Sequence, residues 1–367
     1  MPTVRCMDCG APYPVQGVPH RCLECGGVFD YDGPFNFEVD RMEPDLPGIW
    51  RYRHTFELPQ EAPLVSLGEG NTPLLWDDNA GKPLGLKFES LNPSGSFKDR
   101  GSAVLLSFML SRGVQKAVED SSGNAGASFA AYAARAKMAG KVYVPESASG
   151  PKRQQIEMYG ADLVPVPGPR SEAAKAVLNQ VEQGVPYASH AYLPFGLPGI
   201  ATIAYEIYQQ MSNSTPGTII APVGHGSLLL GIVRGFQSLQ KAGLIDQEPF
   251  YVGVQSAACD PVVRAFRSGL EAMVSTPELP TLAEGVRVRT PVRARALLDQ
   301  IQRSQGIFVS ILEDGIREAH RSLCRRGYYV EPTSAIVWAA FNDLYLELKQ
   351  PVVAVLSGNG LKYTLAS

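Results

Sequence analysis

Short apolar runs alternate with amphipathic stretches from about Leu64 onward, and this alternation limits the possible folds more than any other feature. The runs bounded by Gly, Pro or charged residues are typical of buried strands: LGLKFES, QKAVED, KVYVPE, ADLVPVPG, GTIIAPVG, FYVGVQS and VVAVLSG. Between them lie helical patterns such as GASFAAYAARAKMAG, EAAKAVLNQVEQG, SLLLGIVRGFQSLQKAG and DGIREAHRSLCRRG. Strands that alternate with helices predict an α/β fold built on doubly wound parallel sheets.

The length and charge of the chain narrow its class further. With 367 residues it exceeds what one hydrophobic core usually serves, so we expect two domains and an appendage. A net charge of −3 and a pI near 6.0 argue against nucleic acid or an anionic membrane as the main partner. No run approaches the roughly 20 apolar residues of a membrane span, and the first residues lack a signal core. We therefore expect a cytoplasmic protein.

Four of the six cysteines stand within the first 25 residues. They form two C-x2-C pairs, each followed by a glycine: Cys6, Cys9, Cys22 and Cys25. Four thiolates at this spacing predict a closed tetrahedral site for a structural zinc ion, in a zinc ribbon. Two disulfides are the alternative, which a reducing compartment disfavours.

Small polar residues gather where predicted strands end. The junctions at 92–101, 121–128 and 223–228 each lead into a helix, and the glycine-rich loop 357–360 follows the last strand. In doubly wound sheets, ligands bind at the carboxyl ends of strands and at helix N-termini. These four loops are where we expect the chemistry.

Two of the loops have the features of anion sites. One is a glycine-rich cradle suited to a dianion, formed by Gly224, His225, Gly226 and Ser227. The other offers hydroxyls and free N–H groups to a carboxylate, from Ser121, Ser122, Gly123 and Asn124. The alternatives are a plain strand-to-helix turn for the first loop and an ordinary N-cap for the second.

The stretch NPSGSFKDRG at 92–101 places a lysine at the start of a helix. Ser96 and Asp99 have the spacing of a capping box, which puts Lys98 in the first turn. A cation is disfavoured at the positive end of a helix, so the neutral amine becomes accessible, as a Schiff-base lysine requires. Lys98 could alternatively bind a phosphate as a point charge. Together the three sites indicate a pyridoxal phosphate enzyme that acts on an amino acid.

The sequence also resembles a known family. LGEGNTPLL, LKFESLNPSGSFKDRG, SSGNAGASFAAYAARA and VLSGNGLK are similar to motifs of threonine synthases and their fold-type II relatives, which include the serine/threonine dehydratases. The resemblance, from about residue 64 to the end, implies two doubly wound domains of the tryptophan synthase β-like architecture. We expect a zinc ribbon at 1–30, an extended arm at 31–63, a larger cofactor domain at 64–100 and 204–367, and a smaller domain at 101–203. Relatives are often dimers, so we expect a homodimer.

The resemblance also implies a role for each site residue. Lys98 would bind pyridoxal phosphate and carry protons, and Asn124 would hydrogen-bond the phenolic oxygen of the cofactor. The cradle at 224–227 would hold the cofactor phosphate, and Ser357 would meet the pyridine nitrogen. A hydroxyl there favours β-elimination and β-replacement over transamination. The substrate carboxylate would lie against Ser121, Ser122, Asn124 and Ala125.

The chain departs from threonine synthases in the segment SHAYLPFGLPGIATIAYEI. If Thr202 aligns with the family threonine, Gly196 replaces an arginine and Ala201 a lysine that help to hold the substrate phosphate. His225 and Ala125 replace a usual Asn and a usual Thr. Other cations could compensate, although a solvated surface is the simpler interpretation for them: Lys152, Arg153, Arg287 and Arg289.

Three functions follow from these observations. The first is a threonine synthase, which converts O-phosphohomoserine and water to threonine and phosphate. The second is a dehydratase or β-replacement enzyme on another amino acid, which the missing arginine supports. The third is a non-catalytic ligand sensor, against which the intact Lys98 and Asn124 argue.

Overall fold

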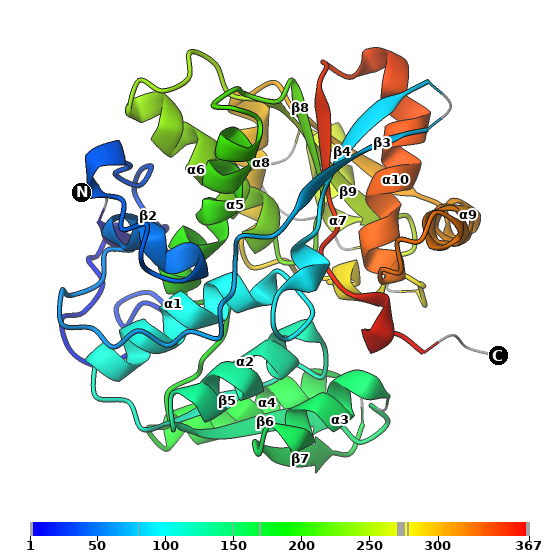
Figure 1. Ribbon diagram of the computed structural model, residues 1–367. Helices are drawn as coiled ribbons and strands as arrows, with labels where there is room; N and C mark the ends of the chain where they lie inside the picture. Colours follow the sequence, from blue (N-terminus) through cyan, green and yellow to red (C-terminus); the bar gives the residue numbers. More distant parts are fainter. Residues whose placement is uncertain are drawn as a thin grey trace. The chain divides into compact units, whose positions relative to one another are not determined.

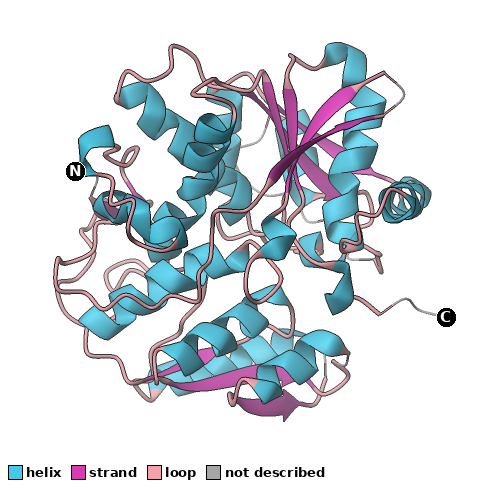
Figure 2. Ribbon diagram, in the orientation of Figure 1, coloured by secondary structure: helices cyan, strands magenta, loops and turns pink. Residues whose placement is uncertain are grey.

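The computed structural model describes residues 3–79, 81–148, 150–168, 170–269, 276 and 279–364. Its strands are β1 (Val4–Cys6), β2 (Phe29–Tyr31), β3 (Leu74–Asp78), β4 (Pro83–Lys87), β5 (Lys116–Glu119), β6 (Ala139–Pro145), β7 (Asp162–Val166), β8 (Thr218–Pro222), β9 (Phe250–Ser256), β10 (Ile307–Ile311) and β11 (Val352–Val355). Its α-helices are α1 (Lys98–Ser111), α2 (Asn124–Arg135), α3 (Pro151–Met158), α4 (Arg170–Glu182), α5 (Leu197–Gln210), α6 (Ser227–Lys241), α7 (Pro261–Arg267), α8 (Ala294–Arg303), α9 (Glu313–Arg325) and α10 (Pro332–Leu344). The helices and strands alternate as the sequence predicts (Figures 1 and 2).

The chain divides into two compact units. Unit 1 comprises Met1–Gly70, Asn92–Gly199 and Lys362–Ser367, and unit 2 comprises Asn71–Leu91 and Ile200–Leu361. Helix α1 falls in unit 1 because it packs against α2, whereas the sequence prediction grouped 64–100 with the larger domain. The predicted limits at 30, 63, 100 and 203 stay a prediction.

Unit 2 is built on a six-stranded sheet in the order β10-β9-β8-β11-β4-β3. All neighbouring pairs are parallel except β3 and β4, which are antiparallel. The sequence analysis missed β10 and β3. Strand β3 escaped it because an edge strand is partly exposed and lacks a continuous apolar run, as the half-exposed Trp76 shows. The prediction of purely parallel sheets was therefore wrong at this edge.

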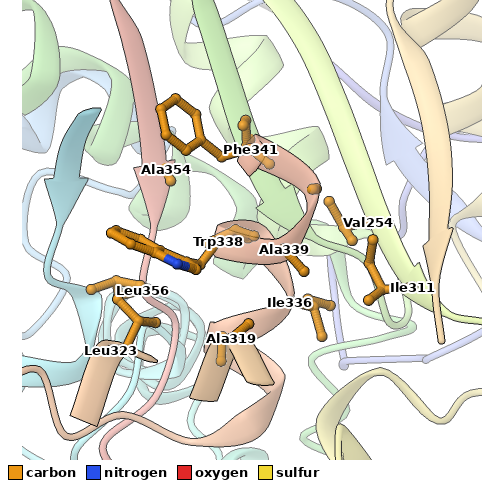
Figure 3. Packing of buried hydrophobic residues seen from close by; sticks show 14 of the residues in the cluster. Val254, Ile311, Ala319, Leu323, Ile336, Trp338, Ala339, Phe341, Ala354 and Leu356 are labelled. Atoms are coloured by element: carbon orange, nitrogen blue, oxygen red, sulfur yellow. The ribbon is translucent and has the colours of Figure 1, made fainter. Parts of the chain in front are cut away.

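Helix α10 supplies much of the core of unit 2. Its apolar side chains pack over the sheet and against α9, as Figure 3 shows for Ile336, Trp338 and Phe341 beside Ala354 and Leu323. The helix is apolar on nearly all sides, with its residues from Pro332 to Phe341 buried. This buried layer fixes strands β8, β9 and β11, and the loops at the carboxyl ends of β8 and β11 carry predicted site residues.

Unit 1 contains a three-stranded parallel sheet in the order β5-β6-β7. Helices cover both faces of this sheet. Successive residues of a strand point to opposite faces, so β6 contacts one helix on each side. The Gly140 side of β6 faces Phe129 and Ala133 of α2, while Tyr143 clusters with Ala173 of α4. A bridge between Val118 and Tyr187 adds a short parallel contact beside β5.

Within unit 1, the N-terminal segment packs through aromatic rings. The ring of Tyr13 lies edge-on to those of Phe29 and Phe195, with 4.7 Å and 4.8 Å between the ring centres. The ring of Phe195 in turn stacks on Phe108 of α1. The region 31–63, predicted as an extended arm, contains the 3-10 helices Val39–Arg41 and Gly48–Thr55. Among the helices within the described ranges, none combines the length and apolar content that a bilayer crossing needs.

Candidate active site

Lys98 is the first residue of α1, as predicted, but the predicted capping box is wrong. Phe97 occupies the N-cap position, and the Ser96 hydroxyl has no hydrogen-bond partner among the described residues. Asp99 turns instead to Ser94 and Ser128. Its side chain is fully buried, and the donors that satisfy it belong to the equally buried Ser94 and Ser128.

Asp99 ties three segments of unit 1 together. Its Oδ2 accepts a 2.6 Å hydrogen bond from the Ser94 amide, and its Oδ1 accepts bonds from the Ser94 hydroxyl and, at 2.6 Å, from Ser128 of α2. The loop before α1 and the first turns of α1 and α2 are therefore held by one carboxylate. Burial raises the pKa of Asp99 to about 6, against the lowering effect of these donors.

The Lys98 amine lies in surroundings that favour its neutral form. Burial lowers the pKa of Lys98 to about 7, Glu119 acts to raise it, and Arg170 acts to lower it further. The amine also lies 4.6 Å from the centre of the Phe97 ring. The sequence analysis expected a neutral amine from the helix dipole, whereas desolvation is the larger cause. A neutral amine near pH 7 can act as nucleophile and as base.

The loop 121–123 joins β5 to α2 and keeps its predicted form. Asn124 begins the helix after Gly123, and the Ser121 hydroxyl accepts a 3.2 Å hydrogen bond from the Gly123 amide. Gly126 is needed because a Cβ there would overlap the carbonyl oxygen of Ser121. This close approach fixes the loop against the first turn of α2. Serine hydroxyls and helix N–H groups of this kind suit a carboxylate.

In unit 2, β8 leads through residues 224–226 into α6 as a glycine-rich cradle. Gly226 adopts φ +99°, which a side chain would strain, and Ser227 starts the helix. A Cβ on Gly224 would approach the Gly285 carbonyl oxygen at 2.9 Å. The His225 carbonyl accepts a 3.3 Å bond from the amide of the buried Arg293. The cradle thus presents backbone to an anion at a helix N-terminus.

Ser357 follows β11, which neighbours β8 in the sheet although the two strands are far apart in the sequence. Their carboxyl ends share one edge of the sheet, so Ser357 and the cradle lie at the same edge of unit 2. Ser357 is buried, and its hydroxyl lies 3.2 Å from that of Ser334, at the start of α10. Ser334 in turn accepts a 2.8 Å bond from the Gly358 amide. The hydroxyl of Ser357 is therefore held in a fixed position.

Each of these groups, taken by itself, is of a kind that suits pyridoxal phosphate. The cradle offers close backbone approach to a dianion, Ser357 offers a neutral hydroxyl, and Lys98 offers an amine of lowered pKa. The sequence from residue 65 to 358 matches the family described as "Pyridoxal-phosphate dependent enzyme". The chain belongs to this family.

The curated relatives of this chain include threonine synthases of several organisms. The chain is 34% identical to the threonine synthase of Methanocaldococcus jannaschii, with 98% of this chain and 92% of the relative covered. It is 31% identical to that of Methanosarcina acetivorans, with 98% and 92% covered, and 32% identical to that of Mycobacterium bovis, with 86% and 89% covered. The similarity thus spans nearly the whole chain in the two archaeal comparisons.

Solved structures of this family share the fold. A threonine deaminase of T.th. has a TM-score of 0.69 and 28% identity, covering 80% of this chain and 94% of that one. The processed threonine deaminase isoform 2 of Solanum lycopersicum has a TM-score of 0.71 at 21% identity, covering 95% of each chain. Because the identity to the Solanum structure is only 21%, this likeness shows the fold alone. The predicted fold-type II architecture is confirmed.

The four N-terminal cysteines lie together. Their sulfur atoms are all within 4.8 Å of one another, with Cys6 and Cys25 at 3.4 Å and Cys9 and Cys22 at 3.6 Å. All four are free thiols, so the alternative of two disulfides does not hold. Sulfur atoms around a tetrahedral zinc ion at about 2.3 Å would lie about 3.8 Å apart. The donor set and its spacing fit that metal.

The segment that departs from threonine synthases is tightly packed. A Cβ at Gly196 would lie 3.0 Å from the backbone oxygen of Gly101, and Ala201 is fully buried in α5. A side chain at Gly196 would therefore crowd the backbone of Gly101, and a long cation at Ala201 would be buried. Of the other cations, Arg153 bonds the Ala148 carbonyl and pairs with Glu157, while Arg287 is half-buried. Arg289 is exposed and Lys152 half-buried.

Three residues of unit 1 near the site escaped the sequence analysis. Asp99 was predicted as the acid of a capping box, whereas the structure gives it Ser94 and Ser128 as partners. Lys362, the last residue of the quoted VLSGNGLK, is buried and donates a 2.7 Å bond to the Ser94 carbonyl. Glu119 is fully buried at the end of β5. Its only sequence signal is an acidic residue at the end of a short predicted strand.

Proposed function

We propose that this chain is a threonine synthase, which converts O-phosphohomoserine and water to threonine and phosphate with pyridoxal phosphate as cofactor. The observation that carries the proposal is the identity of 31–34% to archaeal threonine synthases over 98% of the chain. The site residues support it, because an amine of lowered pKa begins α1 and an anion-binding loop begins α2. The enzyme is then a lyase of amino-acid biosynthesis.

The residues proposed to hold the cofactor are Lys98, Asn124, Gly224, His225, Gly226, Ser227 and Ser357. Lys98 would bind it covalently, and the cradle would bind its phosphate. Ser357 would meet the pyridine nitrogen. A neutral hydroxyl there would not keep that nitrogen protonated, as a carboxylate would. When bound, the cofactor supplies an electron sink for carbanions next to the amino group of the substrate.

The protein's own residues orient the substrate and move its protons. The loop of Ser121 and Ser122, with Asn124 and Ala125 at the start of α2, is proposed to hold the substrate carboxylate. Lys98 Nζ takes a proton from the substrate and returns it at a neighbouring carbon, which an amine with a pKa of about 7 does in both directions. Asp99 keeps the two helix ends in register through Ser128.

A panel of substrates tests this function. The purified enzyme, saturated with pyridoxal phosphate, is given O-phosphohomoserine, serine or threonine, and phosphate and 2-keto acids are measured. We expect phosphate and threonine from O-phosphohomoserine, and Lys98→Ala should abolish both turnover and the visible absorbance of the bound cofactor. Keto acid from serine or threonine, without phosphate release from O-phosphohomoserine, would overturn the proposal in favour of a dehydratase.

We further propose that the four cysteines bind one structural zinc ion, because all four are free and their sulfur atoms converge. A homodimer and a cytoplasmic location stay predictions. Analytical ultracentrifugation of the purified enzyme checks the first, and imaging of the tagged protein in its own cells checks the second.

A further inference from the structure

Tyr187 ties the end of β5 to the segment that runs beside it in unit 1. Its hydroxyl donates a 2.7 Å hydrogen bond to Oδ1 of Asp120, the residue between β5 and the loop 121–123. The backbone of Val118 in β5 bonds to the residues on both sides of Tyr187, at 3.0 and 2.9 Å. Tyr187 is also only 5% exposed, so its ring is closely packed. The donor is therefore held in place beside its acceptor.

The loop 121–123 is fixed at both of its ends. At the far end, the first turn of α2 approaches the Ser121 carbonyl so closely that Gly126 has no room for a side chain. At the near end, Asp120 comes directly before the loop, and its carboxylate accepts the hydrogen bond of Tyr187. Hydrogen bonds to a carboxylate are stronger than those between neutral groups, so this bond restricts the direction in which the chain leaves β5. The position of the loop therefore depends on Tyr187 as well as on α2.

Tyr187 also packs against the four-cysteine segment, residues 6–25, which belongs to the same unit. Within this segment, the ring of His20 lies edge-on to those of Tyr187 and Tyr192, with 5.5 Å between the ring centres in each case. The next residue, Arg21, donates a 3.1 Å bond to the Tyr192 hydroxyl and lies over its ring. The four-cysteine segment therefore contacts the tyrosine that holds the loop.

We infer that Tyr187 is a positioning residue for substrate binding, which holds the loop 121–123 through Asp120. The four-cysteine segment supports Tyr187 through His20, so a change in that segment shifts the loop. This inference rests on the proposed role of the loop as the site of the substrate carboxylate. The carboxylate takes no part in the bonds that change, so a displaced loop weakens binding of the substrate and of the transition state alike. The effect then falls on KM and leaves kcat nearly unchanged.

Amide hydrogen exchange of the full-length protein, measured without substrate, reports on the loop directly. In Tyr187→Phe we expect the peptides that cover 119–126 to exchange about three- to tenfold faster, since the lost bond makes local opening easier. Tyr143→Phe is the matched control, because Tyr143 is buried in the same apolar cluster but lies on β6. It should leave the exchange of these peptides unchanged. His20→Ala should raise it by a smaller factor, because its support of the loop is indirect.

Steady-state kinetics give the second readout. In Tyr187→Phe we expect KM for O-phosphohomoserine to rise about three- to tenfold, with kcat little changed. Unchanged loop exchange or an unchanged KM in this variant overturns the inference, whatever the melting temperature. Unchanged exchange in folded His20→Ala overturns the part that concerns the four-cysteine segment, and His20→Gln takes its place if the alanine variant does not fold. The exchange result needs no turnover, so it stands apart from a failure of the proposed threonine synthase activity.

Discussion

Ser128 of α2 donates a 2.6 Å hydrogen bond to Asp99 of α1, so the two helices that begin at Asn124 and Lys98 share one buried carboxylate. The same carboxylate accepts the Ser94 amide and hydroxyl from the loop before α1. The relative position of Lys98 and the first turn of α2 therefore depends on the Asp99 side chain.

Asp99→Asn should destabilise the protein by about 1–3 kcal/mol at pH 7. The NH2 group of the asparagine replaces one of the two acceptor oxygens, so it would face a hydrogen-bond donor of Ser94 or Ser128. The pKa of Asp99 is raised from 3.8 to about 6, so the folded state binds the proton more tightly than the unfolded state. Asp99 therefore adds stability to the wild type as the pH falls from about 6 towards 4. The gap to the Asn variant should widen over that range. Urea unfolding at pH 7, 6 and 5 measures it, and a gap that narrows would contradict the prediction.

Gly126→Ala should displace the 121–123 loop, since the added Cβ would overlap the Ser121 carbonyl oxygen. We expect KM for the substrate to rise about tenfold or more, because misplacing binding groups by about 1 Å has costs of this size or larger. Gly33→Ala is the matched control, as a Cβ there meets nothing within 4 Å. Steady-state kinetics on both variants give the comparison. Equal KM values for the two variants would show that the loop tolerates the clash.

Trp50→Phe should lower the free energy of unfolding by about 1–3 kcal/mol, because the buried Glu69 loses a hydrogen-bond donor. The Trp50 indole N–H donates a 2.8 Å bond to Glu69 Oε1, while Tyr132 of α2 donates one of 2.7 Å to Oε2. Removing one donor leaves a buried carboxylate partly unsatisfied. Trp76→Phe, at a side chain 49% exposed, should change stability by less than about 0.5 kcal/mol. Differential scanning calorimetry of both variants decides the matter, and equal shifts would count against the role of Glu69.

Cys9→Ser should lower the zinc content from about one ion per chain towards none, because a closed tetrahedral site needs all four thiolates. Elemental analysis after purification without chelators measures the metal. Loss of the ion should also lower the melting temperature, since the four-cysteine segment folds around the site. Cys324→Ser, at a cysteine outside the cluster, is the control. A wild type free of zinc and every other metal would remove the basis of the site.

Local sequence was sufficient for several features. The alternating pattern predicted most strands of the three-stranded and six-stranded sheets, and four short motifs located the loops that carry the proposed chemistry. Gly126 and Gly226 lie where crowding by Ser121 or a positive φ requires glycine, which a sequence can signal because the constraint is local. The four cysteines converge because their spacing sets the two turns that bring them together.

Contacts between distant segments were decided by the tertiary structure alone. Asp99 has the spacing of a capping residue, yet it bonds Ser94 and Ser128, since burial leaves those hydroxyls as its best donors. Burial rather than the helix dipole lowers the pKa of Lys98. Glu119 is one more charged residue in the sequence, and only packing buries it. Desolvation depends on what surrounds a group in space, and no local pattern of residues encodes those surroundings.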